Sequence, residues 1–111
     1  MWRQRKQNKY NAKTKEYGGR IFHSKKEAAY AAELELLKKA GEIKDYKCQH
    51  KLSLDVDGFH ICNYYVDFLV INKDGEEELH EVKGFQTQLW RLKWKLTEAI
   101  YSDLYKLVLI T

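Results

Sequence analysis

The sequence predicts a single α+β domain in which a helix is followed by three antiparallel strands, a second helix and a fourth strand. Three observations predict this order: a helical apolar stripe that stops at Ala40-Gly41, a strand-like alternation over Tyr46–Val56, and two hairpin turns at Asp57-Gly58 and Asn72–Gly75. A chain of 111 residues suits one hydrophobic core. Because a helical crossover lets the last strand run parallel to the third, we expect a mixed four-stranded sheet flanked by helices.

The N-terminal part divides into an arm and the start of the domain. Residues 1–16 are rich in Lys, Gln and Asn and lack periodicity, so they predict a flexible basic arm ahead of a domain over residues 17–111. Tyr17–His23 contains a Gly-Gly turn and a short extended segment. Ser24 then begins the first helix, which ends at Ala40-Gly41.

Two strands are expected on either side of Asp57-Gly58. The polar–apolar alternation of Tyr46–Val56 is typical of a half-buried strand, and the more apolar run Phe59–Ile71 is typical of a central one. Counting outward from the two-residue turn places Cys48 opposite Asp67. Cys62 then faces Ser53.

Those positions keep the two thiols apart, which predicts a reduced, cytoplasmic protein. No apolar run approaches the length of a membrane span, and no signal peptide is visible, so we expect no membrane partner.

The third strand, Glu77–Lys83, carries the most informative residues. The Asn72–Gly75 segment suits a type I turn closed by a bulge at its Gly, and this register places Asp67 opposite Glu81. Opposed side chains share one side of a sheet, with Cβ atoms about 5 Å apart. Lys83 lies on the same side, because residues i and i+2 of a strand share a face.

This arrangement favours a metal site. Adjacent carboxylates repel each other unless a cation lies between them. Asp67, Glu81 and the Val82 backbone carbonyl supply oxygen ligands of the kind that Mg²⁺ or Mn²⁺ prefers, and no organic cofactor is indicated. Lys83 would orient the attacking water and stabilise negative charge. A cross-strand salt-bridge cluster is the alternative interpretation.

An acid on one strand followed by Glu-X-Lys on the next resembles the signature of the PD-(D/E)XK nuclease superfamily, although Val66 stands where the signature has Pro. The chain looks most like small phage-encoded proteins, and more distantly like archaeal Holliday junction resolvases and the endonuclease subunit of Tn7-type transposases. The resemblance covers roughly residues 17–100 and includes the segments Tyr17–Ala28, Cys48-Gln49 and Gly84-Phe85.

The resemblance implies a restriction-endonuclease-like fold and a Mg²⁺- or Mn²⁺-dependent DNA endonuclease, with branched or junction DNA as one substrate and the cytoplasm of a phage host as its location. It implies that Asp67, Glu81 and Lys83 are catalytic. It adds Glu27, which would reach the metal directly or through water, although Ser24–Glu27 also reads as a capping box. Gln49 would support the site, and a solvent-facing strand residue is an equally good interpretation.

Charge is distributed unevenly along the chain. Residues 1–26 carry nine Lys or Arg and one acid, whereas residues 27–111 carry eleven Lys or Arg and fifteen acids. A basic arm on an acidic body is typical of a polyanion binder, so we expect DNA as the partner; a solubilising or expression-derived tail is the alternative. The candidate phosphate-binding residues are Arg3, Arg5, Lys6, Arg20, Lys25, Lys26, Arg91, Lys93 and Lys95, of which a charged outer helix face explains the last three equally well.

Thr87 can cap the second helix, and Lys106–Ile110 reads as the final strand. Trp90 and Trp94 form a stripe that favours core packing or a homodimer interface, with base stacking as a minor alternative. His80 adjoins Glu81 but points to the opposite face, which predicts a structural role. The helix–three-strand–helix order also fits a non-catalytic double-stranded RNA-binding module, which remains the competing function.

Overall fold

The computed structural model describes the backbone of residues 15–17, 20–22 and 24–111, with side chains from Ser24 onward. A short antiparallel pair, β1 (Lys15–Tyr17) and β2 (Arg20–Phe22), precedes the first helix. The predicted basic arm lies outside the described residues except for its last two, which belong to β1.

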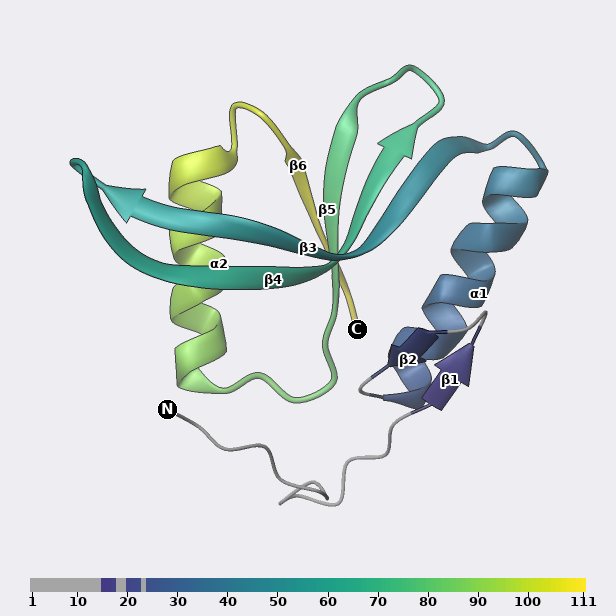
Figure 1. Cartoon of the computed structure of the whole chain (residues 1–111), viewed down its shortest axis with the longest axis horizontal. Helices are drawn as coiled ribbons and strands as arrows, with labels where there is room; N and C mark the ends of the chain where they lie inside the picture. Colours follow the sequence, from purple (N-terminus) through teal and green to yellow (C-terminus); the bar gives the residue numbers. More distant parts are fainter. Residues whose placement is uncertain (1–14, 18–19, 23) are drawn as a thin grey trace.

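The remaining elements follow the predicted order along the chain (Figure 1). The sheet has the strand order β3-β4-β5-β6; its first three strands are antiparallel and β6 runs parallel to β5. The predicted mixed four-stranded sheet flanked by two helices is therefore confirmed. The elements are α1 (Lys25–Lys39), β3 (Ile43–Val56), β4 (Phe59–Asn72), β5 (Glu77–Val82), α2 (Gln88–Tyr101) and β6 (Lys106–Ile110).

The helix ends have the chemistry expected from the sequence. Ser24 caps α1, because its Oγ accepts a hydrogen bond of 3.1 Å from the Glu27 backbone N–H. Gly41 follows α1 with φ +79°, a left-handed conformation that ends a helix at little cost for glycine. Thr87 caps α2 in the same way, accepting from the Trp90 N–H at 3.0 Å.

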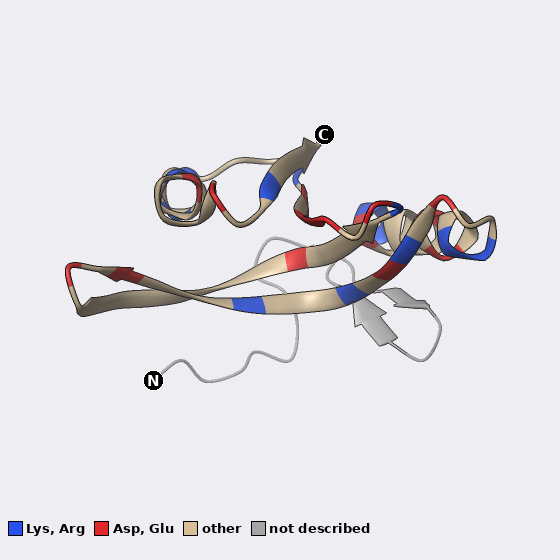
Figure 2. Cartoon of the chain, turned by 90° about the horizontal axis from the view of Figure 1, so that it is seen from above, with Lys and Arg blue, Asp and Glu red and all other residues tan. Residues whose placement is uncertain are grey.

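The two helices cover opposite faces of the sheet. Phe68 and Val70 pack with α1 in one hydrophobic cluster, whereas Leu69, between them, packs with Leu79 and Trp90 in a second cluster. Alternate residues of a strand point to opposite faces, so α1 and α2 cannot share one. Figure 2 shows α2 and β6 on one side of the long β3–β4 hairpin.

The β3–β4 hairpin corrects one part of the predicted register. The turn is as expected: Asp57 and Gly58 have φ +52° and +84°, and Val56 pairs with Phe59. A bulge between the pairs Asp55–His60 and Leu54–Cys62 then shifts the register of the ladder by one residue. The sequence pattern did not reveal this bulge, because the apolar run of the central strand masks a change of phase.

As a result, Cys48 lies opposite Phe68 and not Asp67, and Cys62 lies opposite Leu54 and not Ser53. Both thiols are nevertheless free, as predicted.

The β4–β5 hairpin has the predicted register. The Asn72 N–H donates to the Glu76 carbonyl at 2.8 Å, the Gly75 N–H donates back to the Asn72 carbonyl at 2.9 Å, and Gly75 takes φ +89°. Leu69 consequently pairs with Leu79.

The β3–β4 hairpin twists sharply near its middle. Val66 packs in the α2 cluster, yet Phe68, two residues later on β4, packs in the α1 cluster. Opposite this point, Gln49 on β3 has φ +57°, which is unusual for a residue other than glycine. Figure 1 shows β3 and β4 crossing in this region. The half of the β3–β4 hairpin nearer its turn therefore packs against α2, and the other half packs against α1.

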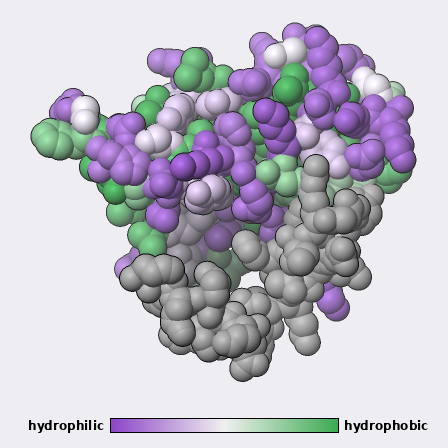
Figure 3. Space-filling view, viewed as in Figure 1, coloured by the Kyte–Doolittle hydropathy of each residue, from purple (hydrophilic) through white to green (hydrophobic). Residues whose placement is uncertain are grey.

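The tip of this hairpin extends past α2 and exposes apolar side chains. Phe59 is 73% exposed and Ile61 53% exposed. Figure 3 shows green surface at the edge of the molecule where the tip lies in Figure 1. Among the described residues, no helix is long and apolar enough to cross a membrane.

Candidate active site

The candidate site lies where the β4–β5 ladder ends. Phe68–His80 is the last backbone pair of that ladder. One residue beyond this pair, hydrogen bonds from backbone N–H groups to side-chain carboxylates join the two strands. The Val82 N–H donates to Asp67 Oδ2 at 2.9 Å, and the Asp67 N–H donates to Glu81 Oε1 at 3.2 Å. The structure thus brings together the two acids that the sequence placed opposite each other.

Glu81 is buried on the α2 side of the sheet, with 3% of its surface exposed. The Trp90 indole N–H lies 3.1 Å from Glu81 Oε2 and 2.8 Å from the Tyr64 hydroxyl oxygen. Burial, reinforced by the charge of Asp67, raises the pKa of Glu81 to about 7. Hydrogen bonds from the Asp67 N–H and the Tyr64 hydroxyl act in the opposite direction.

Lys83 lies on the same side of the sheet as Glu81. Its Nζ stands 5.4 Å from the centroid of the Trp90 ring, within the range of a cation–π contact. Trp90 therefore contacts the acid through its indole N–H and the amine through its ring. The structure brings the Glu81 and Lys83 side chains to one residue of α2.

Glu27 approaches from α1 on the other face. It is 3% exposed, and its Oε2 accepts a 2.7 Å hydrogen bond from Gln49 Nε2. The Ser24 hydroxyl caps the Glu27 backbone N–H, while the Glu27 side chain reaches across to β3. The Glu27 side chain therefore points toward the sheet, where it meets Gln49 of β3.

Gln49 connects Glu27 of α1 with the part of the sheet that contains Asp67. It lies on β3 between the pairs Cys48–Phe68 and His50–Val66, which places it across from Asp67. Its left-handed backbone costs about 1 kcal/mol or more, and such strain is concentrated at functional sites. The exposed Gln49 therefore has a specific partner in Glu27, which a solvent-facing strand residue would not need.

Among the side chains described from Ser24 onward, no three His, Cys, Asp or Glu residues form a group that could hold a metal ion. Asp67 and Glu81 are adjacent, but Glu27 is bonded to Gln49. The available donors at the β4–β5 end are carboxylate and carbonyl oxygens, a set that suits a hard divalent cation.

The predicted basic residues are distributed over several places. Lys25 and Lys26 are exposed in the first turn of α1, directly before Glu27. Arg91 and Lys95 are exposed on α2 and line a groove, whereas Lys93 is only partly exposed. Arg3, Arg5, Lys6 and Arg20 have no described side chains.

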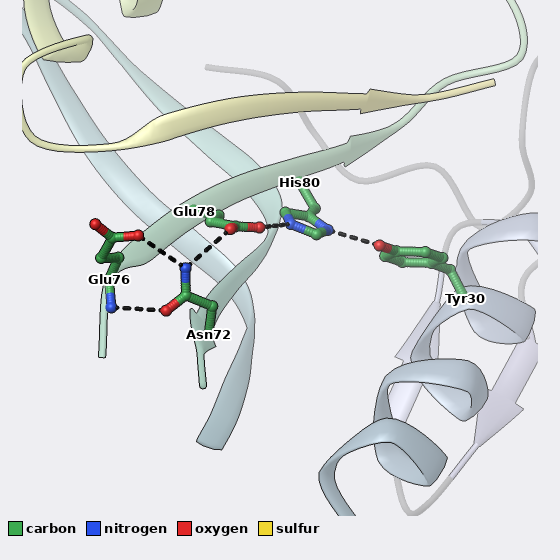
Figure 4. A network of polar contacts seen from close by, with 5 residues as sticks. All are labelled: Tyr30, Asn72, Glu76, Glu78 and His80. Carbon is green, nitrogen blue, oxygen red and sulfur yellow. Dashed lines mark hydrogen bonds and ion pairs between the residues drawn. The ribbon is translucent and has the colours of Figure 1, made fainter. Parts of the chain in front are cut away.

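His80 has the structural role predicted for it. Its Nδ1 lies 2.6 Å from the Tyr30 hydroxyl of α1, and its Nε2 lies 2.8 Å from Glu78 Oε1 (Figure 4). Glu78 also accepts from the Asn72 side-chain amide, which holds the β4–β5 turn. This network points to the α1 face, away from Glu81, and ties α1 to β5.

Two residues of the site were missed by the sequence reasoning. Tyr64 had no assigned role, and Trp90 was expected to serve only packing, interface contacts or stacking. Both pack in the α2 cluster as large apolar residues, yet their polar groups meet at Glu81. The available signal was chemical: a buried Tyr or Trp needs a hydrogen-bond partner, and a buried carboxylate such as Glu81 can accept from both.

Fold and site together define a small α+β domain with a carboxylate pair and an amine at the end of a central hairpin. Residues 7–111 match the model of the family described as protein of unknown function, DUF1064, and the chain belongs to that family. No curated protein and no solved structure matches the chain.

Proposed function

We propose that the protein is a Mg²⁺- or Mn²⁺-dependent DNA endonuclease. The observation that carries the proposal is the meeting of two acidic residues on neighbouring strands: Glu81 accepts a hydrogen bond from the Asp67 backbone N–H, and the Asp67 charge acts on the Glu81 carboxylate. A buried acid beside a second acid is unfavourable for the fold alone, and a divalent cation would relieve the repulsion.

The residues present fit such an ion in donor chemistry. Asp67, Glu81 and the Val82 carbonyl would hold it, and Glu27, which enters from the α1 face and is hydrogen-bonded to Gln49, would join through a water. Once bound, the ion would lower the pKa of a coordinated water and stabilise charge on the scissile phosphate. Burial and, after it, the charge of Asp67 raise the pKa of Glu81, and a bound cation would offset both effects.

The protein's own groups would supply the remaining chemistry. Lys83 carries a positive charge on the Glu81 side, where it can orient the attacking water and stabilise the phosphate oxygens. Trp90 and Tyr64 fix the Glu81 carboxylate by hydrogen bonds. Gln49 fixes Glu27 in the same way, so the acids from α1 and β5 are positioned before substrate arrives.

DNA is the substrate that the charge distribution favours. Lys25 and Lys26 project from the start of α1 beside Glu27, and residues 1–26 together carry a net charge of +8 from nine bases and one acid. Lysines near a carboxylate site offset its repulsion of the phosphate backbone.

The test is a cleavage assay with labelled linear, flapped and four-way DNA in Mg²⁺, in Mn²⁺ and in EDTA. The proposal predicts metal-dependent cleavage that Asp67→Ala abolishes while DNA binding persists. Full activity in EDTA, or no cleavage of any substrate with either metal, would refute it. Tight binding of double-stranded RNA that ignores both metal and Asp67→Ala would favour the competing binding module.

A further inference from the structure

A groove runs along the outer side of α2, between this helix and β6. Its volume is about 430 Å³, enough for a small organic group. It is lined chiefly by Gln86, Trp90, Arg91, Trp94, Lys95 and Glu98.

Two stacked tryptophans form the apolar wall. The rings of Trp90 and Trp94 lie 5.6 Å apart between centroids and are inclined by only 19°. Trp90 is 7% exposed, so Trp94, which is partly buried, presents more of the aromatic surface. One helical turn further along, the next position is Glu98, which is not aromatic. Trp94 lines the groove and is only partly buried, so a flat ring bound there could stack on it.

The polar residues of the groove complement a nucleotide. Arg91 and Lys95 are exposed cations one turn apart, and both residue types bind phosphate through charge-assisted hydrogen bonds. Gln86 and Glu98 offer hydrogen-bond acceptors to the amino groups on the edge of a base.

The groove and the candidate active site share one residue, Trp90. Trp90 lines the groove, while its indole N–H contacts Glu81 and its ring lies under Lys83 Nζ. A nucleotide bound in the groove would therefore lie on the other side of Trp90 from Glu81 and Lys83.

We propose that this groove binds an unpaired nucleotide of the DNA substrate, with the base stacked on Trp94 and its phosphate at Arg91 and Lys95. A base within a duplex presents only its edge, so a stacking wall can be used only by DNA with a single-stranded part. The proposal rests on the proposed function and narrows its substrate to tailed, flapped or branched DNA.

The test compares the affinity of the full-length protein for a blunt duplex and for the same duplex with a single-stranded tail. Fluorescence anisotropy in EDTA measures binding without cleavage. Trp94→Leu keeps an apolar side chain but removes the flat ring, so it should weaken binding of the tailed DNA about 5- to 100-fold. Binding of the blunt duplex should be unchanged, and Trp94→Phe should restore most of the lost affinity.

Two further variants sharpen the comparison. Arg91→Gln, at an exposed position, should weaken binding of the tailed DNA and reduce its salt dependence. Phe59→Ala serves as the matched control, because Phe59 is an exposed aromatic residue at the hairpin tip and is not among the residues that line the groove. It should leave both affinities as in the wild type.

Equal affinity of Trp94→Leu and wild type for the tailed DNA would overturn the proposal, as would equal losses for both DNAs. A wild-type dimer that Trp94→Leu converts to a monomer in sedimentation would assign the groove to a second copy of the chain. Failure to bind any DNA would overturn it as well. Selective binding of tailed DNA without cleavage in Mg²⁺ or Mn²⁺ would refute only the nuclease proposal.

Discussion

The Asp67 backbone N–H donates to the Glu81 carboxylate at the point where the β4–β5 ladder stops. A backbone-to-backbone pair would have continued the sheet here. Instead the Asp67 carboxylate accepts a hydrogen bond from the Val82 N–H, so the side chains of acidic residues join the two strands. The chain thus replaces regular backbone pairing with two backbone-to-carboxylate hydrogen bonds, which place two acidic residues side by side.

Lys83→Ala should lower the rate of DNA cleavage about 10²- to 10³-fold, because it removes the amine that stabilises charge in the transition state. Binding of DNA should change little. The matched control is Lys39→Ala, since Lys39 is exposed at the end of α1, and it should keep the wild-type rate. Equal rates for the two variants in a single-turnover assay would contradict the role given to Lys83.

The stability of the metal-free protein should fall as the pH rises from about 4.5 to about 7. Glu81 has its ordinary pKa of 4.5 in the unfolded chain and a pKa of about 7 in the fold, so the folded state binds the proton more tightly over this interval. The free energy of unfolding should decline by about 1.4 kcal/mol for each unit of pKa difference. Urea denaturation at a series of pH values measures it.

Glu81→Gln is the control for that experiment, because a neutral amide has no proton to lose. It should remove most of the decline between these pH values. A decline that survives in Glu81→Gln would assign the effect to another group.

In Tyr64→Phe, the decline in the free energy of unfolding with rising pH should extend to higher pH than in the wild type. The Tyr64 hydroxyl donates to Glu81 and lowers its pKa, so its removal raises the pKa of Glu81 further above the ordinary value. The loss of a buried hydrogen bond should also cost about 1 kcal/mol of stability. If the pH profile of Tyr64→Phe were parallel to that of the wild type and merely lower, Tyr64 would have only a packing role.

Gln49→Glu should destabilise the protein at pH 8 and not at pH 4. The introduced carboxylate would replace the amide that donates to Glu27, and the two acids repel each other only when both are ionised. Gln49→Met is the matched variant: it loses the hydrogen bond without adding charge, so its destabilisation should be similar at both pH values. The same pH dependence in both variants would show that Glu27 and Gln49 do not interact in solution.

Much of the fold could be predicted because local chemistry decides it. Ser24 and Gly41 set the ends of α1, and the φ preferences of Gly58 and Gly75 set the two hairpin turns. The register of β4 and β5 followed from the second turn, and with it the meeting of Asp67 and Glu81.

The errors and omissions have a common physical cause. The bulge near Leu54 and the left-handed Gln49 are backbone irregularities that tertiary packing stabilises, and neither has a signature in residue type. The convergence of Tyr64 and Trp90 on Glu81 depends on how α2 docks on the sheet. Such docking is set by the whole core and by no single segment.

Titration of the metal-free protein with Mn²⁺ in a calorimeter tests the central claim most directly, since it asks whether Asp67 and Glu81 share a divalent ion. The account predicts saturable binding at pH 8 by the wild type, and its loss in both Asp67→Asn and Glu81→Gln while each variant remains folded. Absence of binding by the wild type, or binding that survives in both variants, would contradict it.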